Sequence, residues 1–218
     1  MIIDQFIDRT NGRKATFYEK GVVGHVGFSK PVCTTLAKYL LESAKEVRGA
    51  GSIHAKGTYV NMEGPAFSTV AESHLYRSWH ADVVGMTTLT EAKLAREAEI
   101  SYGVLAMATD YDCWQPDHDA VTVEFVIQTM EANVKKAQEI VKVCVKKIAK
   151  HAGPCPQANA MRGAIMTDPS KIPAQTLVDL QPLIGKYFPV RQEPEPSLFG
   201  FGLFSVFTLA LAVLASRK

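Results

Sequence analysis

Two aspartates, Asp110 and Asp112, have the residue type and the spacing that could do chemistry in this chain. They come just after an apolar run, 102–107, which has the length of a strand and is too short for a typical helix. Open α/β sheets bind their ligands beyond the carboxyl ends of the strands, so two carboxylates in this place could hold a ligand. For an isolated pair the alternative is favoured, in which one aspartate caps a turn and the other is solvated.

The elements that must position this pair alternate between strand and helix. This order predicts a parallel sheet with crossover helices. Thr88 and Glu91 are three residues apart at the start of one expected helix, which is the pattern of a capping box. The expected strands are 1–7, 58–62, 82–86 and 101–108, and the expected helices between them are 31–47, 67–79 and 88–98.

A long helix is expected over 121–151, after the aspartate pair. Its apolar residues recur at spacings of three and four, which predicts one continuous buried stripe. Lysines occupy the remaining positions, and a solvated face is favoured there over a surface for nucleic acid. One more helix is expected over 174–187. The stripe consists of Val123, Val126, Met130, Val134, Ala137, Val141, Cys144 and Ile148.

The end of the chain differs in composition from the rest. Residues 191–197 (RQEPEPS) predict a stiff polar linker, and residues 198–216 carry no charge. About 20 apolar residues in a helix span roughly 30 Å, the thickness of the hydrocarbon core of a bilayer. We therefore expect a domain over 1–190, a linker over 191–197 and a membrane-spanning tail over 198–216, with a buried C-terminal helix as the alternative.

The bulk composition is that of one globular domain: 218 residues, of which 47% are hydrophobic and 21% charged. The net charge of +2 implies no strong field for nucleic acid. The four cysteines form no C-x-x-C pair, which favours free thiols and a reducing, cytoplasmic compartment. The histidines show no zinc spacing and G-x-S-x-G is absent, so neither a metal nor a hydrolase is expected.

Four motifs in fixed order carry a resemblance to a known family: IIDQFIDRT, NMEGPAFSTVAES, GMTTLTEAKLAREA and AMATDYDCW. Together they resemble the second half of the S-methyl-5'-thioadenosine phosphorylases, which belong to the trimeric purine nucleoside phosphorylase family. The resemblance covers about 1–150 and continues less strongly to 187. It implies an α/β fold with a mixed sheet flanked by helices.

The resemblance also implies an activity. Inorganic phosphate, the co-substrate, displaces adenine from C1' of the methylthioribosyl group, and no cofactor is involved. Asp110 is the implied catalytic residue at N7 and the 6-amino group, with Tyr111 and Asp112 beside it on the substrate. An ionised carboxylate accepts from the amino group and a protonated one donates to N7, and partial burial at the end of a sheet favours the protonated form.

The residues after Pro65 bear on the choice of purine. By resemblance Phe67 stacks on the base or the sugar, although packing in the core is the commoner fate of a phenylalanine. Relatives that act on 6-oxopurines have glutamate in place of Ser68 and asparagine in place of Asp110. Both differences favour a 6-aminopurine, because a mismatched purine would leave buried polar groups unpaired.

The remaining implied site residues surround the sugar. Met86 lies under it and Thr87 reaches phosphate, while the alternative for this pair is a core residue followed by a cap. Val123 and Val126 line the 5' end, where two valines suit a methylthio group, although core packing also explains them. His25 resembles a histidine that a neighbouring subunit of a homotrimer lends to the 5' pocket.

The chain also departs from the family. Ala66 stands where arginine is common, and the glycine-rich phosphate loop and the Arg-His pair of the family's first half have no counterpart. Because 1–7 is expected to be a buried strand, we expect that the first strands of the sheet are missing and that this chain alone is inactive. The alternatives are a membrane-tethered, non-catalytic nucleoside-binding or regulatory protein and a 6-oxopurine nucleoside phosphorylase.

Overall fold

The computed structural model describes residues 1–49, 51–115 and 123–189. The linker predicted at 191–197 and the tail predicted at 198–216 lie outside these residues, so the membrane-spanning tail stays a prediction. Within the described residues, no helix has both the length and the apolar composition that crossing a bilayer requires.

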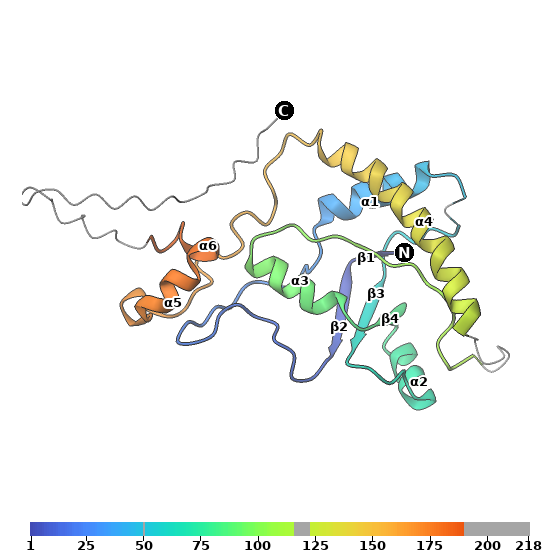
Figure 1. The fold of residues 1–218 in the computed structure, drawn as a ribbon, viewed down its shortest axis with the longest axis horizontal. Helices are drawn as coiled ribbons and strands as arrows, with labels where there is room; N and C mark the ends of the chain where they lie inside the picture. Colours follow the sequence, from blue (N-terminus) through green and yellow to red (C-terminus); the bar gives the residue numbers. More distant parts are fainter. Residues whose placement is uncertain (50, 116–122, 190–218) are drawn as a thin grey trace, which may run out of the picture.

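The centre of the fold is a three-stranded parallel sheet with the strand order β2-β3-β4 (Figure 1). One helix connects β2 to β3, a second connects β3 to β4, and a third follows β4. The predicted parallel sheet with crossover helices is therefore confirmed for these strands. The elements are β2 (Gln5–Arg9), α1 (Thr34–Glu46), β3 (Thr58–Met62), α2 (Val70–Ser78), β4 (Val83–Gly85) and α3 (Thr88–Glu97).

The strand predicted at 101–108 is much shorter in the structure and does not join the parallel sheet. It is reduced to β5 (Val104–Leu105), which pairs antiparallel with β1 (Ile2–Ile3). The reason lies in the hydrogen bonds of the backbone on either side. The Tyr102 carbonyl accepts from the Cys33 N–H at 2.8 Å, and the Ala108 carbonyl accepts from the Asn133 amide at 2.9 Å. These groups bind a loop and a helix. Between them the pairing continues for one more residue, since the Ala106 N–H donates to the Met1 carbonyl at 2.9 Å and the Met1 amino group donates to the Ala106 carbonyl at 2.8 Å.

The capping box predicted for Thr88 and Glu91 is wrong. Thr88 is already inside α3, and the Glu91 carboxylate accepts the Tyr102 hydroxyl at 2.6 Å instead of turning back to the helix end. A capping box does exist at the start of α2. There the Glu72 N–H donates to the Thr69 hydroxyl at 3.2 Å, and the Thr69 N–H donates to the Glu72 carboxylate at 2.8 Å.

The continuous buried stripe predicted along the long helix is also wrong. In α4 (Val123–Ile148), the buried ones among the side chains that the structure describes are Ile140 and Cys144, and Cys144 packs in one cluster with Leu40 of α1. Figure 1 shows that α1 lies beside only the C-terminal half of α4, so the helix is covered along only part of its length. Four members of the predicted stripe are exposed: Met130, Val134, Val141 and Ile148.

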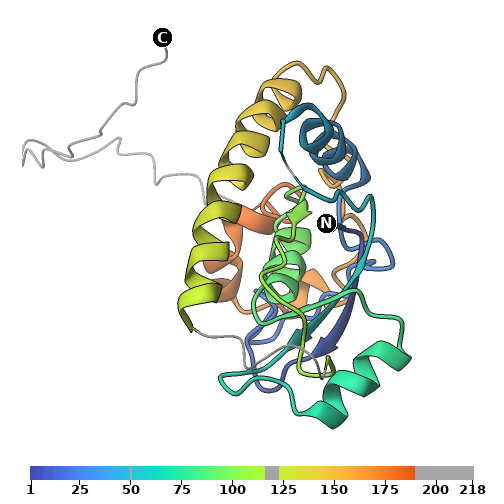
Figure 2. The ribbon, with the colours of Figure 1, turned by 90° about the vertical axis from the view of Figure 1, so that its right-hand side faces the viewer.

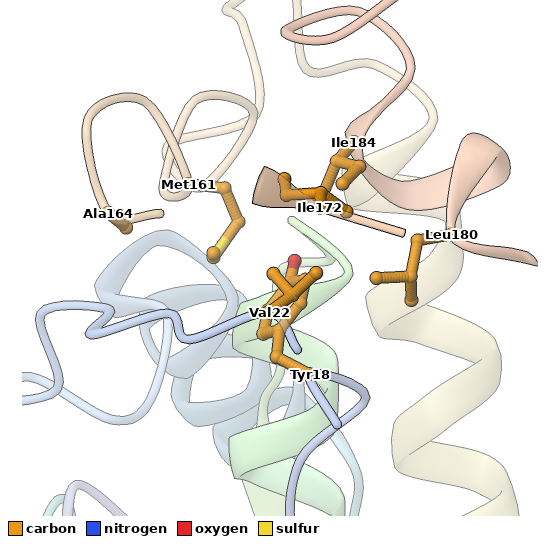
Figure 3. Close-up of a cluster of buried hydrophobic side chains, with 7 residues drawn as sticks. All are labelled: Tyr18, Val22, Met161, Ala164, Ile172, Leu180 and Ile184. Carbon is orange, nitrogen blue, oxygen red and sulfur yellow. The ribbon is translucent and has the colours of Figure 1, made fainter. Parts of the chain in front are cut away.

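A second apolar core, drawn in Figure 3, is built from side chains that lie outside the strands of the sheet. It joins the long loop after β2 to the C-terminal segment, which contains the 3-10 helix Pro169–Lys171, α5 (Ala174–Asp179) and α6 (Gln181–Ile184). The single helix predicted over 174–187 is therefore two short ones. Pro182 has no N–H to donate to the Val178 carbonyl four residues earlier, so the helical hydrogen bonds are interrupted at Leu180. The buried members are Tyr18, Val22, Met161, Ala164, Ile172, Leu180 and Ile184.

Candidate active site

The predicted site residues of the first half gather at the carboxyl edge of the parallel sheet. β3 ends at Met62 and leads into the turn that carries Phe67 and Ser68, while β4 ends at Gly85 and leads into Met86 and Thr87. The two strands are parallel, with Asn61 opposite Gly85. Both turns therefore leave the sheet at the same edge, as the ligand sites of open α/β sheets require.

The loop that carries the two aspartates is held against the same edge. The Cys113 thiol donates to the Ser68 carbonyl at 3.3 Å, and the Arg77 guanidinium lies 3.7 Å from the centre of the Trp114 ring. Figure 2 shows the segment after β5 running down to α2, in agreement with these contacts. Burial and the nearby Asp112 carboxylate raise the pKa of the Cys113 thiol, which keeps it in the donating form.

Asp110 is exposed, so the partial burial predicted for it is not found. The prediction assumed that a buried strand of the main sheet leads directly into this residue, whereas β5 ends five residues earlier and the intervening chain is a loop. One Asp110 oxygen accepts the Thr109 hydroxyl at 2.5 Å, and one Asp112 oxygen accepts the Cys113 N–H at 2.9 Å. Asp112 thus holds the turn that follows it and Asp110 is the exposed one, as the alternative of one turn-capping and one solvated aspartate expected.

The aromatic residues that the resemblance assigns to the substrate face solvent. Phe67 is 86% exposed, so the alternative that it packs in the core is wrong. Tyr111 is 61% exposed, and its ring stands edge to face on Trp114 with centroids 5.8 Å apart. An exposed aromatic face beside carboxylates can bind a planar, hydrogen-bonding ring by stacking and by polar contacts at its edge.

The sugar-side residues are only partly brought together. Met86 is half-buried and Thr87 exposed at the sheet edge. The backbones of Val123 and Val126 lie in the first turn of α4, and their side chains, predicted to line the 5' end of the sugar, lie outside what the structure describes. His25 lies in another part of the fold, where its N–H donates to the Ala164 carbonyl at 2.8 Å beside the second core.

Two polar residues at this edge were missed in the sequence. Asn61 is fully buried in β3, and its amide donates to the Met86 carbonyl at 3.2 Å. Arg13, from the loop after β2, donates to the same carbonyl. The signal for Asn61 was present as an asparagine inside the apolar strand TYVNM. In the part of the chain that the structure describes, there is no cluster of three or more histidine, cysteine or carboxylate side chains that could hold a metal.

Comparison with known proteins decides the family. The sequence pattern of the phosphorylase superfamily matches residues 1–146. This chain belongs to the phosphorylase superfamily. The resemblance drawn from the four motifs is thereby confirmed, and so is the expected phosphorylase-type α/β fold.

Relatives within the phosphorylase superfamily are similar over most of this chain. S-methyl-5'-thioadenosine phosphorylase of Gloeobacter violaceus is 50% identical over 192 residues, which is 87% of this chain and 64% of the relative. Among solved structures, a methylthioadenosine phosphorylase from an antarctic soil metagenomic library is 41% identical with a TM-score of 0.77 over 84% of this chain and 64% of that one. The methylthioadenosine phosphorylase from Schistosoma mansoni in complex with adenine is 29% identical, with a TM-score of 0.67 over 76% and 65%. The chain thus spans less than two thirds of the length of these relatives.

Proposed function

We propose that this chain carries the purine-binding part of a phosphorylase that converts S-methyl-5'-thioadenosine and inorganic phosphate to adenine and 5-methylthioribose 1-phosphate. The observation that carries the proposal is the contact between the aspartate loop and the Ser68 turn, through Cys113 and through Arg77 on Trp114. It brings Asp110 and the exposed Phe67 ring to one edge of the sheet. The names of similar proteins, including a structure that contains adenine, support the same choice of base.

The chemistry assigned to Asp110 follows from the leaving group. When the bond from C1' to the purine breaks, electrons move onto the purine, and a donor at N7 stabilises the departing ring. A carboxyl group serves there because its two oxygens can accept from the 6-amino group and donate to N7. Ser68 adds to the choice of adenine, since a serine offers no carboxylate to accept the N1 proton of a 6-oxopurine.

Binding and turnover are separate predictions for this chain. Thr87 is the residue that we assign to phosphate, and a single hydroxyl cannot replace the backbone N–H groups and arginine that hold phosphate oxygens in other proteins. We therefore expect the 218-residue chain to bind the nucleoside with negligible turnover. Rapid release of adenine from methylthioadenosine and phosphate by the purified chain would contradict this expectation.

Titration calorimetry with adenine, methylthioadenosine and inosine tests the proposed base site. We expect Asp110→Ala to weaken the binding of adenine and of methylthioadenosine by about tenfold or more, since a hydrogen bond to a charged group contributes about 1.5–3 kcal/mol. Asp179→Ala, which removes an exposed aspartate from α5, is the matched control and should change nothing. Unchanged affinity in Asp110→Ala refutes the role of this residue, and preference for inosine favours the 6-oxopurine alternative.

The proposal includes a homotrimer in which His25 contacts the sugar of a neighbouring subunit. The His25 side chain is exposed at the surface of the single chain, as such a contact requires. Sedimentation velocity measures the association state. If the trimer forms, His25→Ala should weaken the binding of methylthioadenosine and leave the binding of free adenine unchanged, because only the nucleoside carries a 5' group. A monomer at all concentrations, or equal loss for both ligands, rules the contact out.

A further inference from the structure

The Arg13 guanidinium connects three pieces of backbone at the carboxyl edge of the sheet. Nη2 donates to the Met62 carbonyl at 3.4 Å and to the Glu63 carbonyl at 2.5 Å, at the end of β3. Nη1 donates to the Met86 carbonyl, at the end of β4. Arg13 itself belongs to the loop after β2, so one side chain joins the exits of all three parallel strands.

The orientation of this guanidinium is fixed by Glu63. Nε of Arg13 lies 3.1 and 3.0 Å from the two Glu63 oxygens, and the Asn11 N–H donates to the same carboxylate at 2.7 Å. The Asn11 N–H and the Arg13 guanidinium lower the pKa of Glu63, so this carboxyl group is ionised at neutral pH. The Arg13 side chain is only 23% exposed, which leaves it little freedom to adopt other positions.

Asn61 completes the arrangement from the interior of the sheet. It is fully buried, and its amide donates to the Met86 carbonyl at 3.2 Å while its oxygen accepts the Leu89 N–H at 3.0 Å. The Met86 carbonyl therefore accepts from both Asn61 and Arg13, which uses its two lone pairs. Because the carbonyl and the next N–H of a trans peptide point in opposite directions, this also fixes the direction of the Thr87 N–H.

We propose that Arg13 is a positioning residue, which with Asn61 sets the Met86–Thr87 peptide and so places the sugar and phosphate side of the site. The inference rests on the proposed function and deepens it. The base side is held separately, by Cys113 on Ser68 and by Arg77 on Trp114. Loss of Arg13 should thus affect ligands that carry a sugar and spare free adenine. Lysine cannot replace it fully, since a point charge does not donate to several acceptors in one plane.

The experiment measures adenine and methylthioadenosine affinities by calorimetry for wild type, Arg13→Met and Arg13→Lys. We expect Arg13→Met to bind methylthioadenosine about tenfold more weakly and adenine within about twofold, with Arg13→Lys between wild type and Arg13→Met. Arg162→Met, at an exposed arginine near the second core, is the matched control. Urea midpoints show whether each variant is folded, and Glu63→Gln, which keeps the shape of Glu63, gives a second test with the same expected pattern.

Three results are decisive. If Arg13→Met loses affinity for methylthioadenosine and keeps its affinity for adenine, the positioning role is supported. Equal losses for both ligands, or no loss for either, overturn it while leaving the proposed function intact. If wild type binds neither ligand, the proposed function fails, and the inference fails with it.

Discussion

The buried carboxylate of Glu97 accepts a hydrogen bond of 2.8 Å from the Thr16 hydroxyl. Glu97 is 6% exposed at the end of α3, and its other oxygen accepts the Phe17 N–H at 2.7 Å. The Tyr18 hydroxyl donates to the Glu97 carbonyl at 3.3 Å, and Tyr18 is a member of the second core. One glutamate thus attaches the long loop, and with it the second core, to the sheet domain.

Removal of this carboxylate should loosen the attachment. We expect Glu97→Ala to lower the free energy of unfolding by about 1–3 kcal/mol, because Thr16 and Phe17 then lose their acceptor. Glu97→Gln, which retains one oxygen, should cost less. Urea unfolding measures both, and Glu131→Ala, at an exposed position of α4, is the control. If Glu97→Ala unfolds at the same urea concentration as the control, the attachment contributes nothing to stability.

A second glutamate makes stability depend on pH. Burial by itself raises the pKa of Glu99, but bonds from the Lys186 ammonium, the Tyr187 hydroxyl and the Met161 N–H outweigh it, so the net pKa lies below its ordinary value of 4.5. When the pKa of a carboxyl group is lower in the folded than in the unfolded state, the ionised group stabilises the fold at pH values above the unfolded pKa. This contribution is lost as the pH falls through the folded pKa. We therefore expect the stability difference between wild type and Glu99→Gln to be constant near neutral pH and to shrink below pH 4.5.

Urea midpoints measured from acidic to neutral pH provide the check. In Lys186→Met the stability should still depend on pH, but less than in wild type, because Tyr187 and the Met161 N–H still bind Glu99. Parallel curves for wild type and Glu99→Gln across the whole range would show that the Glu99 carboxylate does not contribute in this way.

The sequence predicted well those features that depend on neighbouring residues. The strand 58–62 and the helices around it follow from local apolar patterns and turn residues, and the four motifs identified the sheet edge. Asp110 was located by its motif, but its exposure was not predicted, because exposure depends on which strands pair across the chain. Pairing of β5 with β1 joins residues about 100 positions apart, and no local pattern records it.

Periodicity had a further limit in α4. The spacing of apolar residues correctly gave a helix, but it cannot say whether a partner covers the apolar side. Ile140 is buried and its neighbour Val141 is 46% exposed, although only Val141 belonged to the predicted stripe. Asn61 was missed for a related reason, because its role depends on the Met86 carbonyl, which lies just after another strand.

Gly85, just before Met86, has no room for a side chain. A Cβ there would lie 1.8 Å from the Tyr59 hydroxyl oxygen, and Tyr59 is a core residue that is 9% exposed. We expect Gly85→Ala to lower the free energy of unfolding by about 1–3 kcal/mol through overpacking. Gly27→Ala is the control, since a Cβ at Gly27 meets nothing within 4 Å. Thermal unfolding of the two variants measures the difference, and equal stability would show that Tyr59 moves aside without cost.

The adjacent residues Ile140 and Val141 provide a test of how α4 packs. Ile140 is 2% exposed against the rest of the domain, whereas Val141 is 46% exposed. We expect Ile140→Ala to lower the free energy of unfolding by about 2–5 kcal/mol, because it leaves a cavity under the helix. Val141→Ala should change it by less than about 0.5 kcal/mol in the single chain. Urea unfolding at several protein concentrations measures both variants. If Val141→Ala is as costly as Ile140→Ala at every concentration, the exposed side of α4 is covered in solution and the packing of this helix must be revised.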